Sequence, residues 1–145
     1  MLFRSLEGKH ILLSELLAWI RQKPQPHLVE GVGGWEVPIS SEFRVSDLAK
    51  ELGYPVVLVA SDVLGVLNHC LLTAEAIRKK GLRLAAIVLV EPAQKGLATS
   101  YNAEDLRMLL GVEVVAFPRV HSLEEQAAAG AKIWEVLNGQ TAQST

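Results

Sequence analysis

Apolar residues along this chain follow two alternating patterns. Some segments, such as residues 11–22, carry leucine and isoleucine at helical spacing, whereas others, such as residues 56–60, are short and wholly apolar. Glycines and prolines fall between these segments, as is typical of helix and strand ends. The expected elements are helices over residues 11–22, 46–52, 67–80, 102–110 and 121–137, and strands over residues 27–32, 56–60, 84–90 and 112–117.

The order of these elements predicts an α/β fold. Strands separated by helices of this length favour right-handed crossovers and a parallel sheet. Wholly apolar strands are typical of a sheet that is covered on both faces. We therefore expect a three-layer sandwich, a mainly parallel sheet with helices on both faces, in a single domain over residues 1–138 that is followed by a polar C-terminal tail over residues 139–145.

The segment from Leu28 to Ile39 delivers one acidic residue, Glu30, into a glycine-rich turn. An acid at the carboxyl end of a buried strand lies where open α/β sheets bind ligands, and glycines let an anion approach the backbone N–H groups. Glu30 would then face a phosphate-bound Mg²⁺ or a cationic substrate. The alternative is an acid at a strand end, with glycines that serve only a tight turn.

Two motifs, read together, resemble a known family. Residues 29–38 read VEGVGGWEVP, and residues 64–77 read LGVLNHCLLTAEAI. Motifs of this kind in this order resemble dethiobiotin synthetase, the ATP-dependent enzyme family of biotin synthesis. The resemblance extends from Leu6 to Pro118 and matches the C-terminal portion of that family. It implies a sheet like that of P-loop NTPases, but without the strand that carries the P-loop.

The resemblance implies roles for residues of the glycine-rich turn. Glu30 corresponds to an acid that binds Mg²⁺ beside the nucleotide phosphates. Gly33 and Gly34 correspond to the turn that lines the site for the diamine and the phosphate. Trp35 follows these glycines directly, so it either forms a wall of the substrate site or packs in the core.

Further roles fall on residues that follow the later strands. The family segment that reaches across a dimer to the diaminopelargonate of the partner subunit corresponds to Leu64, Gly65, Val66 and Asn68. Tyr101 and Asn102 fall near another segment that approaches the substrate. The positions around the adenine correspond to Val90, Phe117 and Pro118. Val90 stands where the family usually has an asparagine, and a valine side chain offers the adenine no hydrogen bond.

A phosphate-binding P-loop is not found in these 145 residues. Gly8-Lys9 is followed by His10 and has no glycine five positions before it, so it does not match G-x-x-x-x-G-K-[ST]. Two function classes therefore compete. The chain is a dethiobiotin synthetase-like protein that uses ATP and Mg²⁺ with a separately supplied P-loop subunit, or it is a non-catalytic dimeric scaffold that binds a small molecule or a partner protein. A truncated form of an ordinary enzyme is a third alternative.

Composition bears on partners and location. The net charge is −2, and the longest basic cluster is Arg78-Lys79-Lys80, so we expect no nucleic-acid partner. No apolar run is long enough to span a membrane and no signal peptide is recognisable, so we expect a cytoplasmic protein. We also expect a homodimer through the helix that begins near Leu67. Its apolar residues are Leu67, Leu71, Leu72, Ala76 and Ile77.

Overall fold

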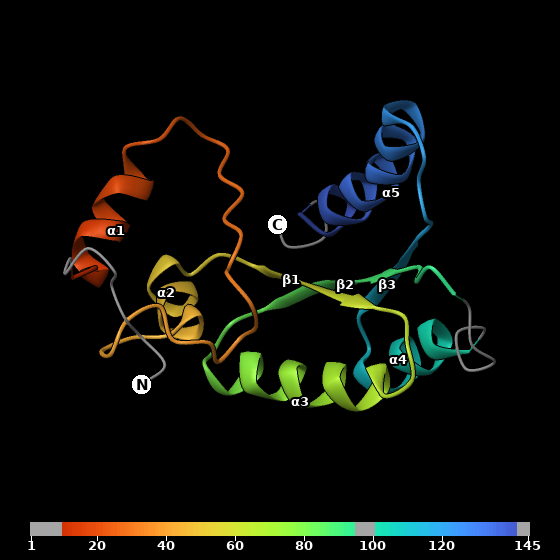
Figure 1. Ribbon diagram of the computed structural model, residues 1–145, viewed down its shortest axis with the longest axis horizontal. Coiled ribbons are helices and arrows are strands. Elements are labelled where there is room, and N and C mark those ends of the chain that lie inside the picture. Colours follow the sequence, from red (N-terminus) through yellow and green to blue (C-terminus); the bar gives the residue numbers. More distant parts are fainter. Residues whose placement is uncertain (1–9, 95–100, 142–145) are drawn as a thin grey trace. The chain divides into compact units, whose positions relative to one another are not determined.

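The computed structural model describes residues 10–94 and 101–141. The chain divides into two compact units, an N-terminal unit over Met1–Tyr54 and a C-terminal unit over Pro55–Thr145 (Figure 1). The N-terminal unit contains α1 (Leu13–Arg21) and α2 (Val45–Leu52). The C-terminal unit contains β1 (Val56–Ser61), α3 (Val66–Lys79), β2 (Leu84–Val90), α4 (Asn102–Leu110), β3 (Glu113–Phe117) and α5 (Leu123–Thr141).

The sheet of the C-terminal unit is parallel, with the strand order β1-β2-β3. Helices α3 and α4 pack against each other on one face of this sheet, and α5 packs against β2 and β3 on the other (Figure 1). The central strand β2 is buried from Leu84 to Leu89, which is the pattern of a strand covered on both faces. The predicted three-layer α/β arrangement is confirmed.

The core of the C-terminal unit consists of apolar side chains from the sheet and from both adjacent helices. Ile87 of β2, Ile77 of α3 and Leu106 of α4 are each fully buried. In the N-terminal unit, a smaller core forms where Leu17 and Ile20 of α1 meet Leu48 of α2. Each helix therefore turns some of its apolar positions toward a core, as the sequence pattern predicted, although others, such as Trp19 and Leu72, are exposed.

One predicted strand is wrong. Residues 27–32 are irregular, and the only pairing outside the three strands, within the described residues, is an isolated bridge between Pro38 and Arg44. A strand exists only where another strand accepts and donates its backbone hydrogen bonds, and residues 10–54, the described part of the N-terminal unit, offer no such neighbour. Glu30 therefore lies in a loop rather than at the end of a strand.

The last helix is longer than expected. We predicted its end near residue 137, but α5 continues to Thr141 and includes residues 139–141 of the expected tail. No proline interrupts the sequence there, and the polar residues that follow Leu137 are compatible with a helix. The assignment of residues 1–138 to a single domain stays a prediction.

Within residues 10–94 and 101–141, no helix combines the length and the apolar character that crossing a bilayer requires.

The buried position of β2 gives a prediction about stability. Replacing Ile87, which is fully buried, with alanine removes three carbon atoms from a packed core, so we expect the free energy of unfolding to fall by about 2–5 kcal/mol. Val59→Ala is the matched control, because Val59 is 62% exposed and its loss should cost less than about 1 kcal/mol. Urea denaturation of both variants measures the difference, and equal costs would contradict the assignment of β2 as the central buried strand.

Candidate functional site

The glycine-rich turn of the N-terminal unit is fixed by backbone hydrogen bonds. The Val37 N–H donates to the Gly34 carbonyl at 3.0 Å, which closes the turn. The Ser46 N–H donates to the Trp35 carbonyl at 2.9 Å, and this bond joins the turn to the first residues of α2. Gly33 has a φ of +79°, a conformation that favours glycine. Backbone hydrogen bonds within the chain therefore support the conformation of the turn.

Packing explains two of the glycines. A Cβ atom at Gly31 would lie 2.7 Å from Cγ1 of Val45, which is too close for any real side chain. A Cβ atom at Gly33 would lie 3.0 Å from Cγ2 of Val37, in addition to the strain of its positive φ. At Gly34 the nearest atom would be 3.9 Å away, an ordinary contact. Glycine is therefore required locally at 31 and 33, whatever the turn binds, whereas the local structure does not require it at 34.

The turn segment has two acids with different surroundings. Glu36 is held by Arg44, whose Nη1 lies 2.7 Å from Glu36 Oε2, and this hydrogen bond raises the pKa of Arg44. Glu30 is exposed and forms no hydrogen bond or ion pair with the described part of the chain. Among residues 10–54, it is the one acidic residue that lines a hollow of about 770 Å³ in the N-terminal unit, whose other walls are mainly apolar.

A lone carboxylate limits the kind of metal site that the turn could form. Within the described ranges, no three His, Cys, Asp or Glu side chains gather into a group that could hold a metal ion. Mg²⁺ commonly uses one or two carboxylates, with phosphate oxygens and waters as its other ligands. Glu30 therefore fits a phosphate-bound Mg²⁺ better than a metal ion held by protein alone.

Trp35 is partly packed. Its side chain is half-buried, and its Nε1 atom is buried without a hydrogen-bond partner among the described residues. The hydroxyl of Ser46, which is fully buried, has no partner there either. A buried donor without an acceptor is costly, so the indole N–H is the feature of this turn that packing leaves unexplained.

The carboxyl edge of the sheet brings several expected site residues together. Ser61 pairs with Val90, and Val90 pairs with Phe117, so the three strands end in register. Pro118 follows Phe117 at the same edge. Open α/β sheets bind ligands at this edge, which is where the sequence placed the adenine contacts.

The loop after β1 presents the expected substrate contacts at that edge. Leu64 is 90% exposed, and Gly65 has a φ of +92°, which turns the chain into α3. Asn68 is also exposed, in the first turn of α3. Val66 is buried to 2% exposure, so its side chain anchors the loop instead of facing a ligand. Of these four residues, Leu64, Gly65 and Asn68 are accessible.

Val90, Phe117 and Pro118 at this edge provide few free donors or acceptors for the hydrogen-bonding atoms of an adenine ring. The Val90 carbonyl already accepts the Asp62 N–H at 2.9 Å, and the Phe117 carbonyl accepts the Glu91 N–H at 2.9 Å. Pro118 has no N–H. Val90, Phe117 and Pro118 therefore fit apolar contact with a ring, but they do not fit recognition of its hydrogen-bonding edge.

The sequence did not single out two acids that follow the strands, Asp62 and Glu91. Asp62 accepts a hydrogen bond from Asn102, and Glu91 Oε2 accepts one from the Arg119 N–H at 3.4 Å. The signal was present, because each acid comes directly after an apolar strand, as Glu30 was expected to do.

Burial, with a smaller contribution from the negative charge of Asp62, raises the pKa of the neighbouring Cys70 thiol, so this thiol is a poor nucleophile.

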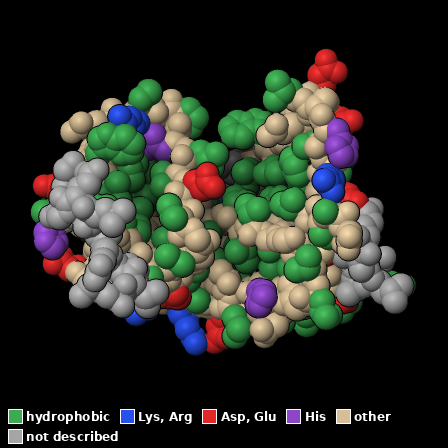
Figure 2. Space-filling view, viewed as in Figure 1, with side chains coloured by type: hydrophobic (Ala, Val, Ile, Leu, Met, Phe, Trp, Pro, Cys, Tyr) green, Lys and Arg blue, Asp and Glu red, His purple; other side chains and the backbone are tan. Residues whose placement is uncertain are grey.

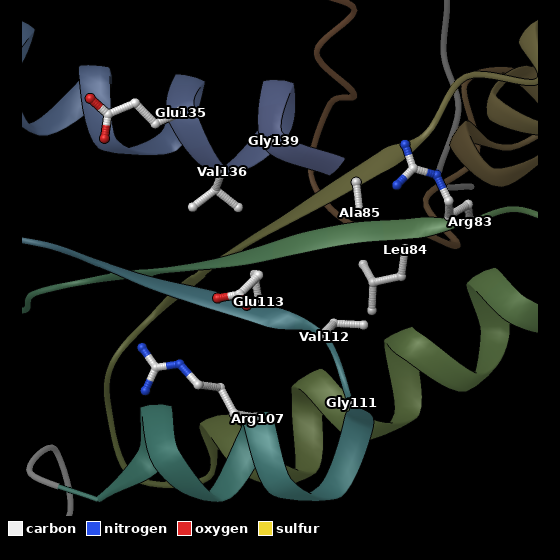
Figure 3. A pocket seen from close by; sticks show the side chains of 10 residues that line it. All are labelled: Arg83, Leu84, Ala85, Arg107, Gly111, Val112, Glu113, Glu135, Val136 and Gly139. Atoms are coloured by element: carbon white, nitrogen blue, oxygen red, sulfur yellow. The ribbon is translucent and has the colours of Figure 1, made fainter. Parts of the chain in front are cut away.

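A second hollow, of about 930 Å³, lies at the opposite end of the sheet, near the first residues of β2 and β3 (Figure 3). Its charged lining residues are Arg83, Arg107, Glu113 and Glu135. Arg107 donates to the carbonyl of Val114, so at least one of these cations serves the packing of α4 on β3. Since charges of both signs line this hollow, it does not favour a ligand of either sign.

Comparison with known proteins agrees with this architecture. Residues 2–127 match the AAA domain family. The chain belongs to this family. The resemblance to dethiobiotin synthetases is also confirmed, because proteins of that name are relatives of the chain.

Three relatives, each named ATP-dependent dethiobiotin synthetase BioD, show the extent of the match. The protein of Aromatoleum aromaticum is 43% identical over 100 residues, which are 64% of this chain and 44% of that protein. The protein of an Anaeromyxobacter species is 37% identical over 115 residues, which are 77% of this chain and 52% of that protein. The protein of Pseudomonas paraeruginosa is 54% identical over 72 residues, which are 48% of this chain and 32% of that protein. The chain therefore spans about half the length, or less, of these relatives.

The turn geometry predicts different effects for adjacent glycines. Gly33→Ala should lower the free energy of unfolding by about 1–2 kcal/mol, because alanine resists a φ of +79° and its Cβ would press on Val37. Gly34→Ala should be neutral or slightly stabilising, because its Cβ meets nothing closer than 3.9 Å. Chemical denaturation of the two variants checks this order, and a greater loss at Gly34 would show that the turn has another conformation.

Proposed function

We propose that this chain forms part of an ATP-dependent dethiobiotin synthetase, which carboxylates diaminopelargonate and closes the cyclic urea of dethiobiotin. The observation that carries the proposal is the carboxyl edge of the sheet, where the three strands end in register at Ser61, Val90 and Phe117 and the exposed loop of Leu64 and Gly65 follows the first of them. The names of the relatives support the same activity.

Each residue then has a limited task. When bound, ATP with Mg²⁺ would supply the phosphoryl group that activates the carboxylated diamine. The exposed carboxylate of Glu30 would bind the metal, and the turn of Gly33 and Gly34 would allow close approach of an anion. The half-buried ring of Trp35 would form a wall of the substrate site.

The carboxyl-edge residues would act on the two organic ligands. Val90, Phe117 and Pro118 would give the adenine an apolar surface. The loop residues Leu64 and Gly65, with Asn68, would contact the diamine, and by family resemblance this is the diamine bound to the partner subunit of a homodimer.

Phosphate binding requires a further segment in this proposal. The 145 residues contain no G-x-x-x-x-G-K-[ST] sequence, so the P-loop lysine would come from outside them, in the same polypeptide or in a separate subunit. The sheet has room for such a segment. Strand β1 pairs with β2 along one edge, and no described strand pairs with its other edge.

A non-catalytic scaffold is the second candidate. It is favoured by the carboxyl edge, where Val90 offers no side-chain hydrogen bond and the backbone carbonyls of Val90 and Phe117 are already used. Such a protein would keep the dimer and a small-molecule or protein-binding surface but would not transfer phosphate.

Partners and location belong to the proposal as well. Lysine and arginine side chains are scattered on the visible surface rather than gathered in a patch, which is consistent with a protein that binds no nucleic acid (Figure 2). Cytoplasmic location remains an expectation from the sequence.

The catalytic proposal is tested by supplying a P-loop. Adding the P-loop portion of a relative should yield dethiobiotin from diaminopelargonate, bicarbonate and Mg-ATP. Glu30→Ala should then lower kcat about a hundredfold or more, because the metal loses a protein ligand. Glu42→Ala is the matched control, since Glu42 is another exposed acid of the N-terminal unit and should leave kcat unchanged. If no P-loop portion restores activity and the chain does not bind diaminopelargonate, the scaffold candidate replaces the enzyme.

The proposed homodimer is tested on α3. Ile77, one of its expected contacts, is fully buried and belongs to the core, whereas Leu72 is 60% exposed and is the stronger interface candidate. Leu72→Glu should dissociate the dimer in sedimentation experiments at micromolar concentration, because it places an unpaired charge in an apolar interface. Leu123→Glu is the matched control, because it makes the same change at an 83% exposed leucine at the start of α5, which packs on the other face of the sheet. A monomeric wild-type chain would refute the dimer.

A further inference from the structure

Asn102 is a buried polar residue whose partner lies far away in the sequence. It is the first residue of α4 and is only 4% exposed, whereas the preceding Tyr101 is 66% exposed. Its Nδ2 donates a hydrogen bond of 2.6 Å to Oδ1 of Asp62, 40 residues earlier. Burying an amide is costly unless it is hydrogen-bonded, and a bond to a carboxylate is stronger than one between neutral groups. This contact is therefore a specific link between α4 and the end of β1.

Asp62 is held from two directions. It follows the last residue of β1, and its N–H donates to the Val90 carbonyl at 2.9 Å, which extends the ladder between β1 and β2 by one bond. Its side chain accepts a hydrogen bond from Asn102, and its negative charge contributes to raising the pKa of Cys70 in α3. The backbone bond fixes where the residue lies, and the side-chain bond fixes how it is turned.

Asp62 is also the first residue of the loop that presents Leu64 and Gly65. Within this loop the Val63 N–H donates to Ser61 and the Val66 N–H donates to Val63, at 2.9 and 3.0 Å. Leu64 at the tip is 90% exposed, so packing does not hold it. The position of the tip therefore depends on the two ends of the loop, where Asp62 is bonded and Val66 is buried.

Asn102 is not needed to hold α4 in place. Leu106, one turn further along α4, is fully buried in the core. At the other end of α4, Arg78 of α3 donates to the Leu110 carbonyl at 2.6 Å. Since these contacts already attach α4, the bond of Asn102 has its main effect on its partner, the loop.

We infer that Asn102 is a positioning residue: through Asp62 it fixes the loop of residues 62–65 so that Leu64 and Gly65 are held ready for the ligand at the carboxyl edge. The identity of that ligand, a diamine, rests on the proposed function. The effect on the loop does not.

Reversing the hydrogen bond tests the inference in the chain itself. Asn102→Asp replaces the amide donor with a carboxyl group, and exchange is measured at a pH high enough to ionise both carboxyl groups, because a shared proton would otherwise restore the bond. Relative to the wild type at the same pH, we expect the amides of Val63 and Val66 to exchange hydrogen about tenfold faster or more. Adding Asp62→Asn restores a bond with the donor on the other side, and exchange should return to within about twofold of the wild-type rate. Glu104→Gln, on an exposed position of α4, is the matched control. Circular dichroism establishes that each variant is folded, and Asn102→Ala replaces Asn102→Asp if the latter unfolds.

Enzyme kinetics give a second test, because a residue that only stabilised the fold would not change KM for diaminopelargonate separately from kcat. In the protein supplied with a P-loop, Asn102→Asp should raise KM for diaminopelargonate about tenfold while kcat changes little, and the double variant should recover the wild-type KM. If the wild-type protein forms no dethiobiotin, the proposed function fails, and hydrogen exchange alone decides the positioning role.

Two outcomes would overturn the inference. The first is unchanged exchange at residues 63–66 in folded Asn102→Asp. The second is faster exchange that the double variant does not reverse, since the loss would then not be specific to this bond.

Discussion

Burial of β2 between two parallel neighbours is the constraint on which the C-terminal unit depends. Its side chains from Leu84 to Leu89 are out of water on both faces, so helices have to cover both sides of the sheet. Pairing on both edges then fixes the register, and the register aligns Ser61, Val90 and Phe117 at one edge. The chemistry of that edge is therefore a consequence of core packing: a one-residue slip of β2 would bury different side chains and also move the ligand-facing ends apart.

The parts of the fold that sequence predicted are those specified by local signals. Mainly apolar runs identified the three strands, although β3 begins with Glu113, and Gly53, which has a φ of +69°, ends α2 where it was expected to. The wrong strand, at residues 27–32, has a less apolar run that includes Glu30, and within the described residues no strand lies beside it. Local pattern specifies the capacity to pair, whereas pairing itself is a property of two segments.

The candidate site shows the same division. Glu30 and the motif residues were found because they stand in a recognisable order along the chain. Asp62 was overlooked although it follows an apolar strand, and its bond to Asn102 could not be found by spacing, because the two residues are 40 positions apart. Gly31 and Gly33 show that one motif can have two explanations. A motif that resembled a ligand site also satisfies steric needs of the turn, so the presence of glycine there does not by itself distinguish binding from folding.

The buried thiol of Cys70 has a practical consequence. It is the only cysteine of the chain, it is 1% exposed, and burial keeps its pKa above that of a free thiol. Near neutral pH it remains protonated and shielded from thiol-reactive reagents. A cysteine introduced at an exposed position would therefore take up a spectroscopic label selectively. Cys70 would not have to be replaced first, so the motions of the protein can be followed with a single substitution.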